Sequence, residues 1–503
     1  MANLTASLGI GLTGLQVAQE AMSVIGHNIA NVNTPDFSQQ AAVISTNPAQ
    51  NFGGVMYGTG ATVTQVQALR NQFLNLQVTQ SLCSQNGAQT RYSGVQAVSS
   101  AFTDDGTTGL NTQIQQFFTS IQTLAANPED DSLRENVVGM AQSMLQEFQS
   151  AYQTVSAQIS SANQQVGSLV PEINSLTSQI ATLNQQISQA TNPSDDNDAI
   201  DQRQELTDQL AALVGIQVST SSDNQYQITL DTGAATLVSG NSAYQMSTAP
   251  TPGNGNNLSV YVQAGATSIN VTDNINGGQL GAQMDLRDTI LPAYQSQLDN
   301  IAGSLAGDFN QIHMAGFSLP DATTGQSTTG TLFFTGAGIN PATGLVNTDP
   351  VTGKPIYSGI INSLQVNPAV AADPSLIAAS ATNGNAGDNT NALSLAGLQT
   401  ALNTVDTNDD GVGDSGPFST VVSSLINQVG TQSQQYNTTA TNQQNLTTAL
   451  QTQQSSVSGV DLDQQAAQLL AFQQAYQASA QFISTISQLT NTLMTTVSAA
   501  TTA

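Results

Sequence analysis

The two ends of the chain have the hydrophobic spacing of amphipathic helices. Near the N-terminus, apolar residues recur at intervals of three or four: Leu4, Leu8, Leu12, Leu15, Ala18, Met22, Ile25 and Ile29. Near the C-terminus, positions recur every seven residues and apolar neighbours broaden the same side: Leu462, Leu469, Tyr476, Ile483, Thr490 and Val497, with Phe472, Ile486 and Leu493. Such spacing places one apolar stripe along a helix, so we predict an amphipathic helix at each end.

The most regular pattern lies inside the chain. Gaps of four and three alternate without interruption through ten positions: Val155, Ile159, Ala162, Val166, Leu169, Ile173, Leu176, Ile180, Leu183 and Ile187. This heptad pattern predicts one long helix, which Pro171 should kink without ending. A turn at Asn192 and Pro193 and a return stripe of Leu206, Leu210 and Leu213 then predict an antiparallel helical hairpin.

Alternating apolar and polar residues follow the hairpin and predict short antiparallel strands. Helical spacing returns later, before a tract rich in Gly, Pro and Thr. We therefore predict an α+β fold, with a discontinuous, coiled-coil-like helical terminal and core domain, a long helical hairpin and inserted antiparallel β domains. The expected domains are terminal helices (1–45 with 456–503), a helical core (46–217 with 277–316 and 386–455), a β-rich domain (218–276) and a second β- and loop-rich insertion (317–385).

Charged residues are scarce and mostly acidic. They make up 8% of the 503 residues, against about 25% in an average soluble protein, and six basic and 33 acidic side chains give a net charge of −27. This charge disfavours nucleic acid and anionic membrane as partners, and no segment approaches the roughly 20 apolar residues of a membrane span. The single cysteine, Cys83, is expected to be a small buried side chain.

The sequence offers little material for catalysis. Gly353 and Lys354 lack the rest of a phosphate-binding loop, and His27 and His313 are expected to be ordinary helix residues. We therefore predict no catalytic residue, no cofactor and no strong metal site. One stretch has the first ligands of a calcium loop but Pro417 in place of the bidentate Glu, which favours an ordinary turn over a weak calcium site. Its candidate ligands are Asp406, Asn408, Asp410 and Asp414.

The stretch HNIANVNTPDFSQQ, residues 27–40, directly follows the N-terminal stripe. It resembles the signature of bacterial flagellar rod, hook and hook-associated proteins, in which Asn-Asn-Ile-Ala-Asn-x-Asn-Thr-Pro-Gly-Tyr-Ser follows a helix. The matching residues are Asn28, Ile29, Ala30, Asn31, Asn33, Thr34, Pro35 and Ser38. The departures are His27, Asp36, Phe37 and Gln39. Asp36 replaces a Gly, a change that matters most if the position needs a positive φ, which Asp tolerates better than most residues.

Three further segments, 198–218, 277–316 and 457–484, are similar to a hook-associated member of this family, whereas hook and rod subunits resemble only the ends. The resemblance implies a structural, non-enzymatic subunit at the junction of hook and filament. Its implied partners are the hook protein, the other hook–filament junction protein, copies of itself in a ring, and a cytoplasmic chaperone on the C-terminal helix. It also implies export by the flagellar type III apparatus, with no nucleic acid and no membrane insertion.

The resemblance further implies that the terminal stripes are assembly helices, uncovered in the monomer and paired coaxially in the assembled tube. Two alternatives remain. A hook or filament subunit would share the termini but should lack the internal heptad pattern. A secreted hydrolase or adhesin with such termini is a more distant alternative, since a hydrolase would need a pair of facing carboxylates.

Overall fold

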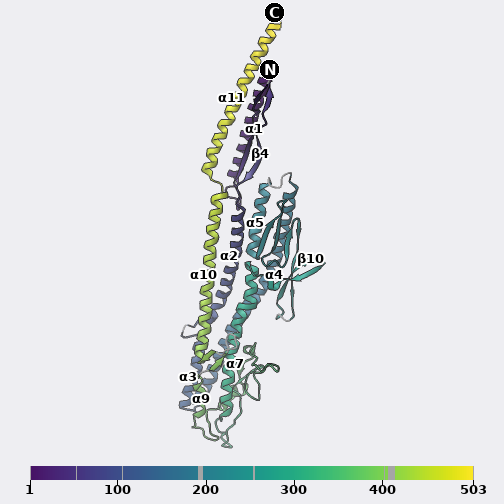
Figure 1. Ribbon diagram of the computed structural model, residues 1–503. Helices are drawn as coiled ribbons and strands as arrows, with labels where there is room; N and C mark the ends of the chain where they lie inside the picture. The colour runs from purple at the N-terminus through teal and green to yellow at the C-terminus, as the bar shows by residue number, and fades with distance from the viewer. Residues whose placement is uncertain are drawn as a thin grey trace. The chain divides into compact units, whose positions relative to one another are not determined.

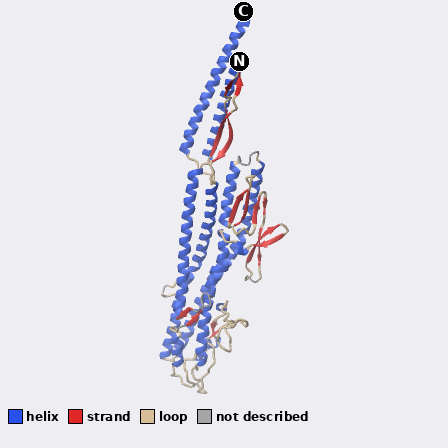
Figure 2. Cartoon of the chain, viewed as in Figure 1, coloured by secondary structure: helices blue, strands red, loops and turns tan. Residues whose placement is uncertain are grey.

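The computed structural model describes residues 2–52, 54–104, 106–190, 196–252, 255–401, 403–405 and 414–501. Long helices dominate, and the strands form small antiparallel sheets (Figure 2), so the predicted α+β class is confirmed. The chain forms two compact units. Unit 1 comprises residues 1–87, 168–281 and 441–503, and unit 2 comprises residues 88–167 and 282–440.

In unit 1, helices from opposite ends of the chain lie side by side (Figure 1): α1 (Ala2–Ala30) and α11 (Leu462–Thr501). They run antiparallel, because Gly11 lies against Ile483 whereas Asn28 is bonded to Gln465. A β-hairpin that the sequence analysis missed follows α1, and its long strands contact that helix. Its strands are β1 (Gln40–Thr46), β2 (Gln50–Phe52), β3 (Val55–Tyr57) and β4 (Ala61–Ala68).

The polar residues of α11 form hydrogen bonds within the helix. The hydroxyls of Thr485, Thr490 and Thr492 donate to carbonyl oxygens four residues earlier, at 3.0, 2.8 and 2.9 Å. Residues 464–503 include no Asp, Glu, Lys, Arg or His. From Gln464 onward the surface of this helix is therefore uncharged, and the hydroxyls of Thr485, Thr490 and Thr492 have hydrogen-bond partners within the helix.

The long internal helix and its return helix form as predicted: α4 (Asp131–Gln189) and α5 (Asn197–Leu213). Nine of the ten heptad positions are buried, and Ile159 is half-buried. Pro171 does not end α4, which continues to Gln189. Near the turn of the hairpin, Leu183 and Ile187 pack against the first turn of α5, which closes a small core there.

Two antiparallel sheets follow α5 in unit 1, which confirms the predicted strands. The first has the order β5 (Ile216–Thr220), β6 (Tyr226–Leu230), β7 (Thr236–Ser239), β8 (Ser242–Ala243), and the second the order β11 (Thr267–Asn270), β10 (Leu258–Ala264), β9 (Met246–Pro250). Side-chain amides of α4 hold both sheets. Asn184 bonds the N–H and C=O of Tyr226, both at 2.9 Å, and Asn174 does the same for Met246.

Unit 2 has its own hydrophobic core, centred on phenylalanines. Phe117 of α3 (Leu110–Ala126) and Phe309 of α7 (Leu291–Ala315) meet Phe333 and Phe334, with ring centroids 4.8 to 6.2 Å apart. The latter two belong to the loop-rich tract 317–385, whose named strands have two residues each, β12 (Phe334–Thr335) and β13 (Gln365–Val366). This tract therefore shares its core with α3 and α7.

The boundaries between the two units lie at positions that differ from the expected domain boundaries. The chain passes between units inside four helices: α2 (Gln72–Ser99), α4, α6 (Gly278–Asp285) and α10 (Phe418–Ser458). The division into four domains stays a prediction. The remaining elements are α8 (Pro368–Ala372), α9 (Thr390–Gly397), β14 (Asn403–Val405), β15 (Asp414–Gly416) and short 3-10 and π turns.

Candidate functional site: the terminal helices and their motif

Small residues bring α1 close to α11. Gly11, Gly14, Ala18, Ala21, Ile25 and Asn28 recur at gaps of three and four, and the last four are buried. A Cβ atom built on Gly11 would lie 2.8 Å from Cγ1 of Ile483, and one on Gly14 would lie 3.0 Å from Oγ of Ser479. Because neither glycine has a side chain, the two backbones can approach each other here.

The predicted apolar stripes are largely used within the chain, which corrects the expectation that both are uncovered in the monomer. On α11 the half-buried members are Leu469, Phe472, Tyr476, Ile483 and Ile486, and the exposed members are Leu462, Leu493 and Val497. On α1, Ile25 is buried, Leu4, Leu15 and Met22 are half-buried, and Leu8, Leu12 and Ile29 are exposed. Ala18 and Ile25 belong both to this stripe and to the row of small residues, whereas the exposed Leu8, Leu12 and Ile29 lie outside that row.

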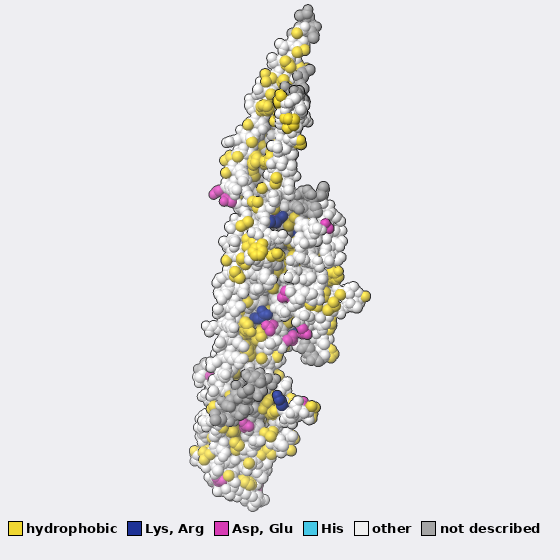
Figure 3. Space-filling model, in the orientation of Figure 1, with side chains coloured by type: hydrophobic (Ala, Val, Ile, Leu, Met, Phe, Trp, Pro, Cys, Tyr) yellow, Lys and Arg dark blue, Asp and Glu magenta, His cyan; other side chains and the backbone are white. Residues whose placement is uncertain are grey.

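Large apolar side chains of α11 outside the predicted stripe are exposed as well. Leu470, Leu489 and Met494 on α11 are 60%, 55% and 60% exposed, and Phe482, which lies beside Gly11 of α1, is 43% exposed. In Figure 3 hydrophobic side chains are visible along α11. Several exposed apolar side chains along one helix are consistent with a surface that contacts other molecules.

The N-terminal motif forms the turn between α1 and β1. Asn28 is buried and its amide pairs with the backbone of Gln40, donating to O at 2.8 Å and accepting from N at 2.9 Å. Its second N–H bond reaches Oε1 of Gln465 on α11, at 3.0 Å. Asn28 therefore ties α1, β1 and α11 together.

The rest of the motif shapes the turn itself. Asn31 donates to the carbonyl of His27 at 3.1 Å and accepts from the hydroxyl of Thr34 at 3.1 Å. Ile29, Ala30, Asn33, Thr34 and Pro35 have exposed side chains. The stretch from Val32 to Gln39 lines a polar cavity of about 670 Å³ together with residues 454–461.

The departures from the family signature can be placed in the structure. Asp36 has φ of 54°, so the position where the signature has Gly does need a left-handed backbone. Burial raises the pKa of the Asp36 carboxyl, and the charges of Glu205 and Asp201 raise it further. The rings of His27 and Phe37 pack edge to face with centroids 5.4 Å apart. Two of the substitutions thus contact each other.

The first two turns of α5 form hydrogen bonds with this motif. Sequence reasoning did not identify these turns as part of the site. Asp201 accepts from N and Oγ of Ser38, both at 2.9 Å, and from Nε of Arg70 at 2.7 Å. Asp198 accepts from Gln40 at 2.8 Å and from Nε2 of His27 at 3.1 Å. These pairs are separated by more than 130 residues in sequence, so no local spacing could reveal them.

A buried polar network lies deeper along α5. The carboxyl of Asp208 accepts bonds from the hydroxyl of Thr79 and from Gln204, and Gln204 accepts from the Tyr226 hydroxyl at 3.0 Å. Desolvation raises the pKa of Asp208 to about 7, the charge of Asp36 adds to this effect, and the bonds from Thr79 and Gln204 oppose it. Arg203 is fully buried with its guanidinium 3.7 Å from the Tyr226 ring centroid, and desolvation lowers its pKa.

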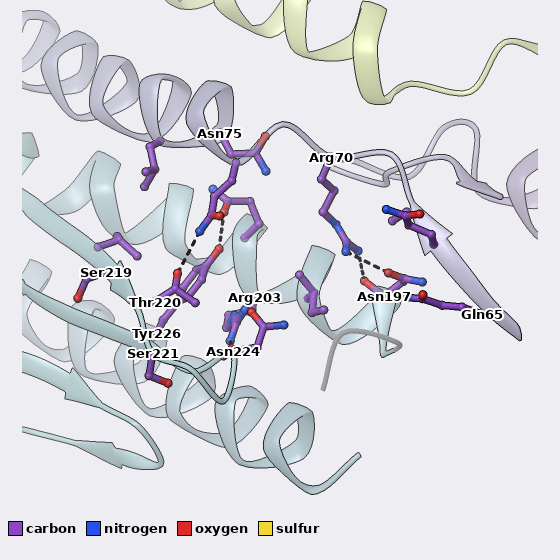
Figure 4. A pocket seen from close by; sticks show the side chains of 17 residues that line it. Gln65, Arg70, Asn75, Asn197, Arg203, Ser219, Thr220, Ser221, Asn224 and Tyr226 are labelled. Carbon is purple, nitrogen blue, oxygen red and sulfur yellow. Dashed lines mark hydrogen bonds between the residues drawn. The ribbon is translucent and has the colours of Figure 1, made fainter. Parts of the chain in front are cut away.

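A cavity of about 790 Å³ opens beside this network (Figure 4). Arg70 points to Asn197 on one side of it, and Arg203 lies beside Asn224 and Tyr226 on another. Amide, hydroxyl and guanidinium groups dominate its lining, and all of the charged ones form hydrogen bonds within the protein. Among the described residues that line it, no nucleophile, base and acid are arranged together.

The other predicted chemistry can be stated briefly. His313 is buried in α7 and bonded through both ring nitrogens, with its pKa lowered to about 4 by desolvation. Cys83 is buried as expected. The calcium-loop candidates Asp406, Asn408 and Asp410 lie outside the described residues, as does the Asp414 side chain. Within the described ranges, no cluster of three metal-ligating side chains occurs, and no helix has the length and hydropathy of a membrane span.

Comparison with known proteins gives matches along most of the chain. A model of the helical domain of flagellar hook-associated protein FlgK matches residues 95–334. Models of the flagella basal body rod protein and of the C-terminal part of the flagellar basal body rod proteins FlgEFG match residues 8–37 and 451–496. Both terminal helices thus lie largely in segments that resemble rod proteins, while the hairpin lies in a segment that resembles a hook-associated protein.

Whole-length relatives agree with these matches. Flagellar hook-associated protein 1 of Escherichia coli is 27% identical over 546 residues, covering 96% of this chain and 98% of that protein, and the Bacillus subtilis protein of the same name is 25% identical over 502 residues, covering 93% and 94%. A solved structure, the flagellar hook junction protein FlgK from Burkholderia pseudomallei, shares the fold with a TM-score of 0.63 at 20% identity, over 76% of this chain and 100% of that one.

The fold, the terminal helices and the motif between them define a structural protein of the bacterial flagellum, in the class of rod, hook and hook-associated proteins. Within that class the helical hairpin and the whole-length matches are decisive. The chain belongs to the family of flagellar hook-associated protein 1, and the alternative of a hook or filament subunit is set aside.

Proposed function

We propose that this chain joins hook to filament by packing the exposed faces of α1 and α11 against neighbouring subunits. The proposed neighbours are the hook protein, the other hook–filament junction protein and further copies of this chain. Before assembly, a chaperone would cover α11 in the cytoplasm, and the flagellar type III apparatus would export the chain. Family membership supports a role in the flagellar axis, and the surfaces of the helix pair support the contacts.

The observation that carries this proposal is the exposed apolar surface of α11. Leu470, Leu489 and Met494 are each more than half exposed, although the same helix already packs against α1. Leaving such side chains in water forgoes about 25 cal/mol for each Å² of apolar surface that a neighbour could cover. The lack of charge over residues 464–503 also limits repulsion between chains that each carry −27.

The test is the triple substitution Leu470→Ser, Leu489→Ser and Met494→Ser. Because these side chains are each more than half exposed, we expect circular dichroism and melting temperature close to those of the parent. Cells that carry the variant should nevertheless show bare hooks and release flagellin into the medium. A matched control is Val351→Ser, which removes an apolar side chain that is 89% exposed but lies in unit 2.

Two results separate assembly from export. The variant should appear in the culture medium in the amount seen for the parent, because a junction subunit that cannot assemble is still exported. Full-length filaments on cells with the triple variant would refute the proposal. Retention of the variant inside the cell would instead assign the exposed face to export.

A further inference from the structure

Three residues on the first two turns of α5 hold the segments that flank the terminal helix pair. We call Asn197, Asp198 and Asp201 the α5 clamp. Asn197 donates to the carbonyl of Val66 on β4 at 2.8 Å and accepts from Arg70 at 3.0 Å through its side chain and 2.6 Å through its backbone. Asp198 and Asp201 hold His27, Ser38 and Gln40, as described above. The clamp therefore contacts the end of α1, the motif turn, the start of β1, β4 and the segment between β4 and α2.

We propose that the α5 clamp positions the terminal helix pair on the helical hairpin, so that it sets the direction of α1 and α11 relative to the hairpin within unit 1. Its value for joining hook to filament rests on the proposed function, but the positioning itself does not. Asn197, Asp198 and Asp201 act here as positioning residues, through Ser38, Gln40 and Arg70. None of the three needs to touch a neighbouring subunit.

The chemistry of the contact explains why it fixes an orientation. Apolar contacts are not directional, so a helix pair held by them could rotate or slide at little cost. Hydrogen bonds to a carboxylate depend on distance and angle, and the Asp201 side chain takes three of them from two elements. Asp201 and Ser38 are 7% and 5% exposed, so water does not readily replace these bonds.

The clamp also connects segments of the chain that match different protein families. The terminal segments match models of rod proteins, whereas α5 falls in the segment that matches the hook-associated helical domain. Terminal helices that are shared among axial proteins are thus oriented by residues that belong to this family's own domain. The clamp thus gives the terminal helices an orientation that distinguishes this subunit from others with similar terminal helices.

Spin labels can measure the orientation directly in the full chain. In a Cys83→Ala background, one label pair on Gln473→Cys and Ser178→Cys reports the distance from α11 to α4, both within unit 1. A second pair, on Gln19→Cys and Gln474→Cys, reports the distance from α1 to α11. All four label positions are exposed.

Asp201→Ala should broaden the α11 to α4 distance distribution about twofold or more, because the released pair samples several orientations. The α1 to α11 distribution should stay narrow. Ser38→Ala, which removes one hydroxyl bond and leaves no charge unpaired, should give a smaller broadening of the same kind. Asp223→Asn, on an exposed turn of the same unit, removes one charge and should change neither distribution.

Two outcomes would overturn the proposal. If both variants keep the parent's α11 to α4 distribution, the clamp does not set the orientation. If Asp201→Ala broadens both distributions together, Asp201 serves the general stability of unit 1. Neither outcome affects the triple substitution of exposed apolar side chains on α11, so failure of this proposal can be told apart from failure of the proposed function.

Discussion

Replacing Asp208 with Asn should make the stability of the protein less dependent on pH. In the folded chain, burial raises the pKa of Asp208 from 3.8 to about 7, and unfolding returns the carboxyl to water. Between about pH 4 and pH 7 the folded chain holds a proton that the unfolded chain has released. The free energy of unfolding therefore falls as the pH rises through this window. Below it both states are protonated, and above it both are charged.

The size of the effect follows from the difference between the two pKa values. About 7 minus 3.8 is roughly three units, and each unit corresponds to about 1.4 kcal/mol, so Asp208 costs the folded state about 4 kcal/mol above pH 7. Asn cannot ionise and has nearly the same shape. The variant should lose this part of the pH dependence, with its largest gain over the parent near pH 8 and little difference near pH 4.

Urea unfolding followed by circular dichroism at several pH values measures this, since the chain has no Trp for fluorescence. The difference between parent and variant cancels other titrating groups, such as Asp299, whose pKa burial raises to about 6. Asp223→Asn serves as the control for removing one negative charge. Equal pH slopes for the parent and Asp208→Asn would show that the buried carboxyl is hydrated or paired in a way that the network does not reveal.

Two further predictions concern α1 and its turn. Gly11→Ala should weaken the α1 to α11 contact, because its Cβ would lie 2.8 Å from Cγ1 of Ile483, and overpacking of this kind costs about 1 to 3 kcal/mol. Gly26→Ala, which has nothing within 4 Å, should instead stabilise α1 by up to about 1 kcal/mol, and thermal melting of the two variants in opposite directions would confirm the contact. Asp36→Ala should destabilise the turn by roughly 1 to 2 kcal/mol because φ is 54°, whereas Asp36→Asn, which tolerates that φ and removes a carboxyl of raised pKa, should raise the melting temperature near neutral pH. Equal melting temperatures for the Ala and Asn variants would show that the turn relaxes to a negative φ.

The internal helix could be predicted from the sequence because its signal is local. Ten apolar residues at strict heptad gaps specify one buried face, and tertiary packing only had to supply a partner for it. The same holds for the strands after α5, where alternation and turn residues agree. The hairpin of β1 and β4 lacked such a local signal. It follows a motif that the sequence presents as a turn, and its strands pack on α1, which comes earlier in the chain.

Hydrophobic periodicity predicted the buried face of α1 only in part. Gly11 and Gly14, which lie against α11, carry no hydrophobic signal, and their row of residues shares only Ala18 and Ile25 with the predicted stripe. A search for small residues at gaps of three and four would have found this face. The α5 clamp has no such signature, since Asp201 and Ser38 are 163 residues apart and each is unremarkable alone.

The threonine hydroxyls of α11 have a consequence for how this helix meets water. Because Thr485, Thr490 and Thr492 donate to carbonyls of their own helix, the part of each side chain that remains for the surroundings is largely its methyl group. The surface of α11, which is polar by composition, therefore forms fewer hydrogen bonds to water even in the isolated chain. Covering it requires fewer hydrogen bonds to water to be broken than covering a helix rich in Ser–water or Lys–water contacts. When a neighbouring molecule covers α11, removing these hydroxyls from water should therefore cost little, because they are already hydrogen-bonded within the single chain.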